Sequence, residues 1–154
     1  MRYSFCMIKR VELQHKVKYL GKEYSVILHN DSDFSTAFKT LQYLSGKFQK
    51  NEVPVIYGDA SDYNRIFIQD GDRIVHFYAY DDGNNEKART FVDDMLNKHN
   101  VETIFLFVVC TKENSLLDIK NILDDLCKDD EQWLFYMSAD EKAKKTSVRI
   151  VAGI

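Results

Sequence analysis

One stretch of the sequence restricts the fold more than any other. Residues 104–110 read Ile-Phe-Leu-Phe-Val-Val-Cys and contain only apolar side chains. Such a run is far shorter than the roughly 18 residues of a membrane span. It is typical of a strand that is covered on both faces. The sequence therefore predicts a central strand over residues 101–110, inside a sheet that carries other elements on both sides.

The rest of the chain shows the two periodicities of helices and strands. Apolar residues recur at intervals of three and four after Ser32 or Asp33, over residues 86–99, and after Asn114 or Ser115, which predicts three helices. Further strands are expected at residues 3–11, 16–20, 23–29, 53–57, 65–69, 73–80, 133–137 and 147–152. The expected fold is a single α/β domain of the α+β type over residues 1–154. Its mixed, largely antiparallel sheet has about eight or nine strands and carries three helices.

The predicted core is formed by the largest apolar side chains on the inner faces of these elements. It comprises Phe5, Phe38, Leu41, Phe91, Phe105, Phe107, Val109, Ile122 and Trp133. There is one proline in 154 residues and no proline-rich linker, which agrees with a single domain.

From Arg65 onward, the order strand, strand, helix, strand, helix, strand, strand resembles the GCN5-related acetyltransferase fold, over about the last 90 residues. The resemblance implies a loop before a helix that binds a cofactor diphosphate. Only Gly83 matches the glycine pattern of that loop. Asp81 and Asp82 put negative charge where a diphosphate needs positive potential. A degenerate acetyltransferase-like enzyme is therefore kept as an alternative.

Other active-site patterns are missing from the sequence. It has no phosphate-binding glycine loop, no dinucleotide fingerprint and no nucleophile elbow. Its four histidines and three cysteines lack metal-ligand spacing, so no catalytic residue, metal or cofactor is predicted. Three widely separated cysteines argue against a disulfide framework. Together with the lack of a secretory leader, they lead us to expect a cytoplasmic protein without membrane contact.

One group of residues is a candidate pocket. In the expected strand at residues 73–80, His76 alternates onto the same face as Tyr78 and Tyr80, and Cys110 ends the central strand. A titratable base in an aromatic pocket suits binding or catalysis. The competing interpretation of His76 is a half-buried side chain that is hydrogen-bonded to a neighbour. His15, His29 and His99 lie near the ends of expected elements, so they are expected at the surface or in turns.

The net charge of −3 conceals a strong asymmetry along the chain. Residues 1–50 hold nine basic and four acidic residues, whereas residues 51–154 hold twelve and twenty. Several acidic pairs lie off the apolar stripes of the second and third predicted helices, which would present one acidic surface if both helices covered the same face of the sheet. The candidate partner-binding residues are Asp93, Asp94, Asp124, Asp125, Asp129 and Asp130.

These features favour a small protein-binding domain over an enzyme. The size, the missing motifs and the acidic surface suit an inhibitor or an immunity-type protein, such as a bacterial or phage accessory protein or a member of a toxin–antitoxin pair. It would occlude a basic partner such as a nuclease by electrostatic capture. A second alternative is a single-stranded nucleic-acid-binding module built on the basic N-terminal third. The pI of about 5.8 argues against nucleic acid as a partner.

Overall fold

The computed structural model describes residues 13–19, 22–48, 50, 53–57, 73–101 and 103–153. The elements are β1 (Leu13–Tyr19), β2 (Lys22–His29), α1 (Phe34–Leu44), β3 (Val53–Ile56), β4 (Arg73–Tyr80), α3 (Asn85–Lys98), β5 (Ile104–Cys110), α4 (Leu116–Leu126), β6 (Trp133–Ala139) and β7 (Ser147–Gly153). The mixed α/β class and the three helices are confirmed within these ranges. They hold seven strands, fewer than the eight or nine predicted, because the expected strands at residues 3–11 and 65–69 lie outside the described residues.

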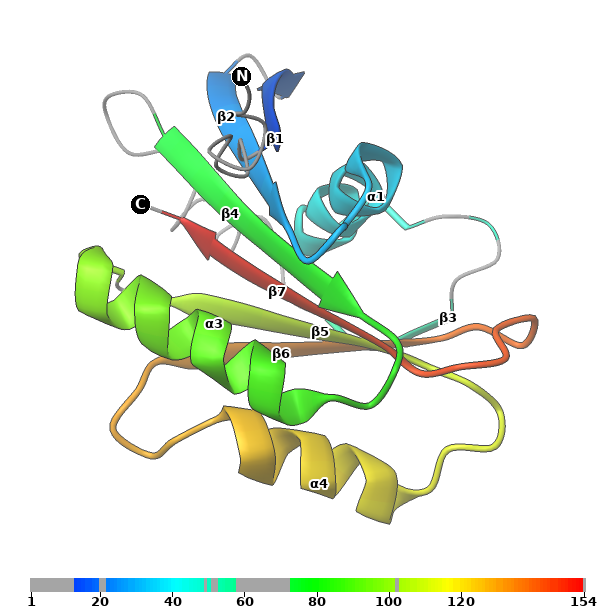
Figure 1. Cartoon of the computed structure of the whole chain (residues 1–154). Helices are drawn as coiled ribbons and strands as arrows, with labels where there is room; N and C mark the ends of the chain where they lie inside the picture. Colours follow the sequence, from blue (N-terminus) through cyan, green and yellow to red (C-terminus); the bar gives the residue numbers. More distant parts are fainter. Residues whose placement is uncertain are drawn as a thin grey trace, which may run out of the picture.

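The seven strands form one sheet in the order β1-β2-β4-β7-β5-β6-β3. The pairs β2–β4 and β5–β6 are parallel, and the other four pairs are antiparallel, as the prediction of a largely antiparallel sheet requires. β7 runs antiparallel to both of its neighbours, β4 and β5. The strands β2, β4, β5 and β6 therefore point the same way, and their carboxyl ends meet at one edge of the sheet (Figure 1).

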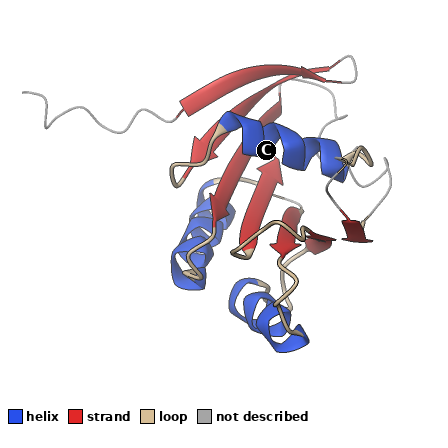
Figure 2. Cartoon of the chain, turned by 90° about the vertical axis from the view of Figure 1, so that its right-hand side faces the viewer, coloured by secondary structure: helices blue, strands red, loops and turns tan. Residues whose placement is uncertain are grey.

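Helices cover both faces of this sheet (Figures 1 and 2). α1 packs on one face with a cluster that includes Val26, Phe77 and Phe107, whereas α3 and α4 pack on the other face with Tyr78, Leu106 and Ile150. Every residue of β5 is buried, which confirms the prediction of a central strand between two layers.

Local signals in the sequence determine where the helices begin. The Asp33 carboxylate accepts a hydrogen bond from the backbone N–H of Thr36 at 2.7 Å, so it caps α1. Ser115 and Asp118 form a reciprocal capping box at the start of α4. Both caps are among the predicted ones, because short polar side chains satisfy the free N–H groups of a first helical turn.

Two sequence expectations need correction. Trp133, predicted in the core, is only half-buried, and its indole N–H donates to the Glu131 carboxylate at 3.1 Å. Phe38 is also only partly buried, and Phe5 lies outside the described residues.

The resemblance to the GCN5-related acetyltransferases is not confirmed. The last strand, β7, lies in the middle of the sheet, and the hairpin β1–β2 that precedes the matched segment belongs to the same sheet.

Tyr43 joins α1 to the last two strands in the order of the sheet, β6 and β3. Its side chain is fully buried and its ring stacks on Phe107 with 4.3 Å between the centroids. Its hydroxyl lies 2.7 Å from the carbonyl oxygen of Met137 in β6 and 3.3 Å from that of Ile56 in β3. A buried hydroxyl that bonds two strands holds the helix in position over β6 and β3.

We therefore expect Tyr43→Phe to lower the free energy of unfolding by about 1–2 kcal/mol, because the ring contacts remain and the two carbonyls lose a buried donor. Urea denaturation measures this loss. The control is Tyr57→Phe, since Tyr57 is 59% exposed, and we expect that variant to stay within about 0.5 kcal/mol of the parent. Equal effects of the two substitutions would contradict the role given to the Tyr43 hydroxyl.

Candidate functional site

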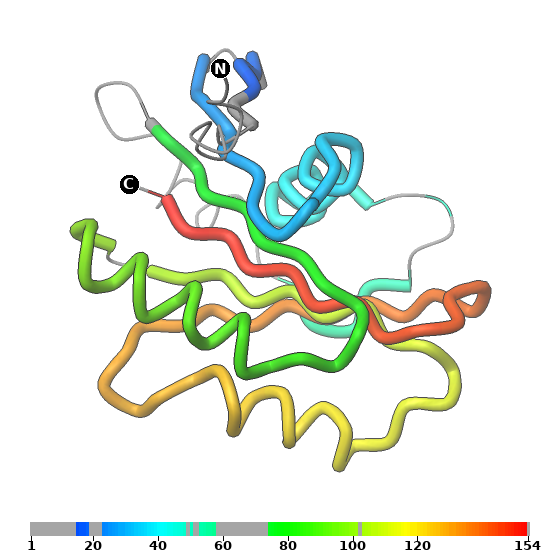
Figure 3. The backbone as a smooth tube through the Cα atoms, viewed as in Figure 1, coloured from blue at the N-terminus to red at the C-terminus, as the bar shows by residue number. Residues whose placement is uncertain are grey.

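A crevice opens where two neighbouring parallel strands send the chain to opposite faces of the sheet. β2 leads into α1 on one face, and the adjacent β4 leads into α3 on the other. In α/β sheets, ligands bind outside the carboxyl ends of strands at such a switch point. Here an open crevice of about 610 Å³ lies between residues 30–36, 79–82 and 143–149. Figure 3 shows the turns after β2 and β4 and the β6–β7 connection at this edge.

The first two segments are clamped to each other. The side-chain amide of Asn30 donates to the carbonyl oxygen of Ala79 at 2.8 Å. The backbone N–H of Ala79 donates to the Ser32 hydroxyl at 3.0 Å, and that hydroxyl donates to the carbonyl oxygen of His29 at 2.5 Å. Asn30 and Asp31 both have a φ of +56°, the left-handed region in which residues other than glycine are uncommon. The bonds fix a backbone shape that the two residues would otherwise rarely adopt.

Charges of both signs line the crevice. Asp31, Asp33, Asp81 and Asp82 lie on the β2 and β4 turns, and Lys144, Lys145 and Arg149 come from the β6–β7 segment. The Arg149 guanidinium lies 5.4 Å from the centre of the Phe107 ring and donates to the Thr40 hydroxyl at 3.1 Å. The pKa of Asp33 is lowered, mainly by the Thr36 N–H bond and further by the Arg149 charge.

Asp81 and Asp82 were expected to repel a diphosphate and to form one of the acidic clusters of the chain, and the crevice that they line was not predicted. The signal lay in the order of elements. Two strand–turn–helix units follow each other, each with a polar turn directly after its strand. Local sequence patterns do not reveal that β2 and β4 are neighbours in the sheet or that the helices after them lie on opposite faces.

The candidate pocket residue His76 belongs to a cluster of three histidines. His29 Nε2 lies 2.8 Å from His76 Nδ1, and the rings of His76 and His99 have centroids 5.3 Å apart. The cluster borders a hollow of about 440 Å³ beside α3, which Asp94 and Lys98 also line. His29 ends β2 and His99 directly follows α3, as expected, but both are half-buried against His76 and are not open surface residues. The β2–β4 pairing and the end of α3 bring them together.

His76 is neutral at physiological pH. Only 5% of its surface is exposed, and burial lowers its pKa to about 4, with further lowering by the charges of His29 and His99. When the His76 ring is neutral, its Nδ1 and the Nε2 of His29 can share one hydrogen bond, in which one nitrogen donates and the other accepts. Protonation would place a charge in a buried site between two other bases.

The other candidate pocket residues lie elsewhere on the same face. Tyr78 stacks on Phe91 at 4.8 Å, and the Tyr80 hydroxyl donates to the Asn85 side chain. The register places His76 level with Ala152, and Ala152 level with Ile104, whereas Cys110 ends β5 six residues later. At about 3.3 Å per residue, Cys110 is roughly 20 Å further along the sheet than His76. Burial also raises the pKa of the Cys110 thiol.

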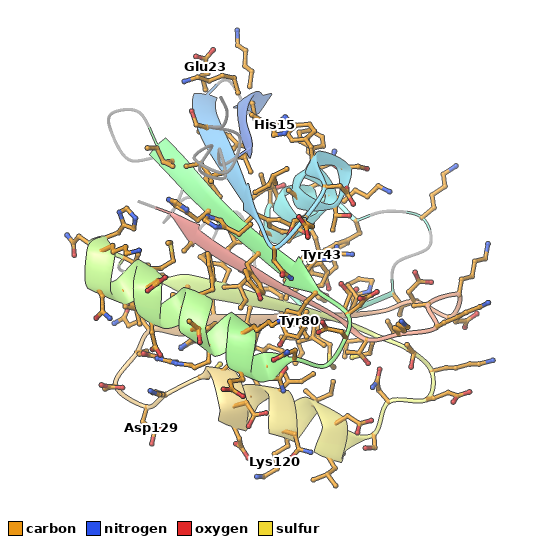
Figure 4. All side chains as sticks on the ribbon, in the orientation of Figure 1. His15, Glu23, Tyr43, Tyr80, Lys120 and Asp129 are labelled. Atoms are coloured by element: carbon orange, nitrogen blue, oxygen red, sulfur yellow. The ribbon has the colours of Figure 1, made fainter. Side chains whose placement is uncertain are left out.

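The structure brings the two acidic helices together on one face, but it balances much of their charge. Arg89 binds Asp93 at 2.6 Å, Lys98 lies 3.8 Å from Asp94, and Lys120 binds Asp124 at 2.6 Å. The Asp125 carboxylate accepts from the Asn85 side chain at 2.8 Å. Asp129 and Asp130 are exposed in the α4–β6 connection. Figure 4 shows Lys120 and Asp129 on the outer side of α4 and of this connection.

Arg89 forms an ion pair that is largely withdrawn from water. It binds Glu131 through two hydrogen bonds of 2.6 and 2.5 Å and donates to the carbonyl oxygen of Leu126 at 2.6 Å. The side chains of Arg89 and Glu131 are only 13% and 11% exposed. The Arg89 hydrogen bonds lower the pKa of Glu131 to about 2. The Arg89 side chain thus fastens α3 to the end of α4 and to the connection that follows it, and it also binds Asp93, whose side chain is 47% exposed.

Across the described ranges, no three His, Cys, Asp or Glu side chains are grouped so that they could hold a metal ion. None of the described helices combines the length and apolar character needed to cross a bilayer. Of the basic residues considered for nucleic-acid contact, Arg2, Lys9 and Arg10 lie outside the described residues, and Lys16 and Lys18 are exposed on β1.

Comparisons with known proteins give a likeness in structure alone. No protein-family model matches the chain, and no curated protein matches its sequence. Among solved structures, a mutant FtsZ from M. jannaschii is 13% identical, with a TM-score of 0.42 over 82% of this chain and 42% of FtsZ. An empty FtsZ dimer from M. jannaschii is 12% identical, with a TM-score of 0.45 over 82% and 41%. The chain thus spans about two fifths of the length of either FtsZ chain.

The histidine cluster predicts acid sensitivity. The pKa of His76 is about 4 in the folded chain, below its usual 6.5, so the unfolded chain binds more protons between these values. Stability should fall as the pH drops from about 6.5 towards 4, by about 1–2 kcal/mol more in the parent than in His76→Gln. Urea denaturation at several pH values measures the difference. Identical slopes for the parent and His76→Gln would refute the prediction.

The Arg89–Glu131 ion pair should contribute more to the free energy of unfolding than an exposed ion pair does. Arg89→Met should cost about 2–4 kcal/mol, because it leaves a withdrawn carboxylate without its partner. Adding Glu131→Gln should restore part of that loss. Lys120→Met, which breaks an ion pair whose side chains are 68% and 59% exposed, should cost less than about 1 kcal/mol. The three values come from chemical denaturation at pH 7, and a loss for Lys120→Met as large as that for Arg89→Met would disprove the assignment.

Proposed function

We propose that the protein is a binding domain that captures a basic protein partner on one side of α4. The contact region, here the α4 surface, consists of Leu116, Leu117, Asp124, Asp129 and Asp130. The observation that carries the proposal is the pair of leucines in the first turn of α4, which are 88% and 63% exposed on a helix whose opposite end leads into an acidic segment. An inhibitor or immunity-type protein that occludes a nuclease would use a surface of this kind.

The exposure of the two leucines follows from how α4 is placed. α3 and α4 run in the same direction across one face of the sheet (Figure 1). Asn85, the first residue of α3, contacts Asp125 near the end of α4. The first turn of α4 therefore extends beyond α3 and carries Leu116 and Leu117 into solvent. Large apolar side chains that are exposed together are frequent anchors of protein interfaces.

The distribution of charge favours α4 over α3 as the contact region for a basic partner. Residues 85–98 hold three acidic and three basic residues, whereas residues 116–131 hold six acidic and two basic ones. Asp93 and Asp94 are next to Arg89 and Lys98, so they contribute little net field. Asp124 is likewise paired with Lys120, so the excess of negative charge lies mainly at Asp129 and Asp130, just beyond the end of α4 opposite to the leucines. Such an acidic group raises the association rate of a basic partner, while the apolar anchors supply affinity.

The test is a triple charge reversal, Asp124→Lys, Asp129→Lys and Asp130→Lys, beside the single variant Leu117→Ser. Each immobilised protein is incubated with a lysate of the source organism, and the retained proteins are quantified by mass spectrometry. A basic protein that the parent retains is then purified, and its Kd is measured at two salt concentrations. We expect the triple variant to bind at least about tenfold more weakly and with a flatter salt dependence. Leu117→Ser should weaken binding but keep the parent salt dependence.

The matched control reverses three acidic residues outside the α4 surface: Glu23, Glu86 and Glu141, all exposed. It changes the net charge by the same amount, and Glu23 lies at the end of the sheet distant from α4 (Figure 4). The control should bind the partner as the parent does. If both triple variants lose binding equally, net charge and not the α4 surface governs capture. If no basic protein distinguishes the parent from the α4 variants, the proposed function is wrong.

A further inference from the structure

We infer that the crevice at the carboxyl ends of β2 and β4 binds a small zwitterion, a molecule that carries an ammonium group and a carboxylate or phosphate group. This site lies at the edge of the sheet and shares no residue with the α4 surface. The inference is therefore independent of the proposed capture of a protein partner.

The fold provides the crevice before any ligand arrives. The turn after β2 is joined to the end of β4 by the Asn30–Ala79 and Ala79–Ser32 hydrogen bonds, each between a side chain of the turn and the Ala79 backbone, so their separation is fixed by these contacts. The crevice is open to solvent, and its volume of about 610 Å³ is within the range of about 300–1,000 Å³ that is typical of small-molecule sites. A site whose walls are held in place loses little conformational entropy on binding.

The charges of the crevice are separated by the elements that carry them. Asp31 and Asp33 follow β2, and Asp81 and Asp82 follow β4, so carboxylates occupy the turns. The cations Lys144, Lys145 and Arg149 come from the third segment, before and within β7. Arg149 is the most firmly positioned of them, because it lies over the Phe107 ring and donates to the buried Thr40 hydroxyl.

This distribution favours a ligand with both signs of charge. A simple anion would meet the three cations but also four carboxylates, and the N-terminus of α1 is already occupied by the Asp33 carboxylate. A simple cation would be attracted by the four carboxylates but repelled by Lys144, Lys145 and Arg149. A zwitterion places its ammonium group by the turn carboxylates and its anionic group by the cations, where charge-assisted hydrogen bonds form on both sides.

The crevice also has room for a substituent on the ligand. Asp81, Asp82 and Lys145 line a second hollow of about 530 Å³, which continues towards Asn85 at the start of α3. Gly83, with a φ of +75°, borders this hollow and has no atom within 4 Å of where a Cβ would stand. The two hollows thus form one groove along the edge of the sheet.

The test is an NMR titration of the uniformly ¹⁵N-labelled protein. O-phosphoethanolamine and β-alanine are the two zwitterionic probes, and they distinguish a phosphate from a carboxylate as the anionic group. Ethanolamine and inorganic phosphate are the corresponding single-charge probes. We expect at least one zwitterion to shift the amide signals of residues 30–33, 81–82 and 143–149, with at least about tenfold higher affinity than either single-charge probe.

Two variants locate the contacts. Asp31→Asn removes a carboxylate while keeping a residue that tolerates the left-handed conformation, and Lys145→Gln removes a cation. Each should weaken zwitterion binding by about tenfold. Lys142→Gln, in the same connection but outside the crevice, should leave the affinity unchanged. The inference is overturned if neither zwitterion shifts these signals at concentrations up to about 50 mM, if a single-charge probe binds as tightly, or if Lys142→Gln weakens binding as much as Lys145→Gln.

Discussion

The position of β7 is the constraint on which the rest of the structure depends. By pairing antiparallel with β4 on one side and β5 on the other, it joins two parallel pairs into one sheet. Four strands then share one direction, and the turns that follow them gather at one edge. The connection that precedes β7 ends at the same edge, which is why Lys144 and Lys145 face the turns after β2 and β4.

Much of the fold could be predicted because its signals are local. The apolar run at residues 104–110 identified the central strand, and Asp33 and Ser115 identified two helix starts. Alternation also placed His76, Tyr78 and Tyr80 on one face of β4. These predictions depend only on neighbours within a few residues, for which periodicity and capping rules are sufficient.

The candidate sites could not be predicted in the same way, because they depend on the order and register of distant strands. The meeting of His29 and His76 requires β2 and β4 to be parallel neighbours, although 47 residues separate the two histidines. The crevice further requires α1 and α3 to lie on opposite faces. Ion pairs belong to both groups. The pairing of Lys120 with Asp124 could be predicted, because it follows from helical spacing, whereas the Arg89–Glu131 pair spans 42 residues and depends on the packing of distant elements.

The contacts between α3 and α4 determine which acidic groups are presented outward. Asn85 accepts from the Tyr80 hydroxyl and donates to Asp125, while Arg89 binds Glu131 and the end of α4. These bonds turn Asp125 and Glu131 towards the protein and hold α4 against its neighbour. Leu116, Leu117 and Asp124 are therefore carried by a helix that these bonds hold at its carboxyl end, next to the connection that carries Asp129 and Asp130. A partner that binds there does not have to order the helix, so less of the interaction free energy is lost to conformational entropy.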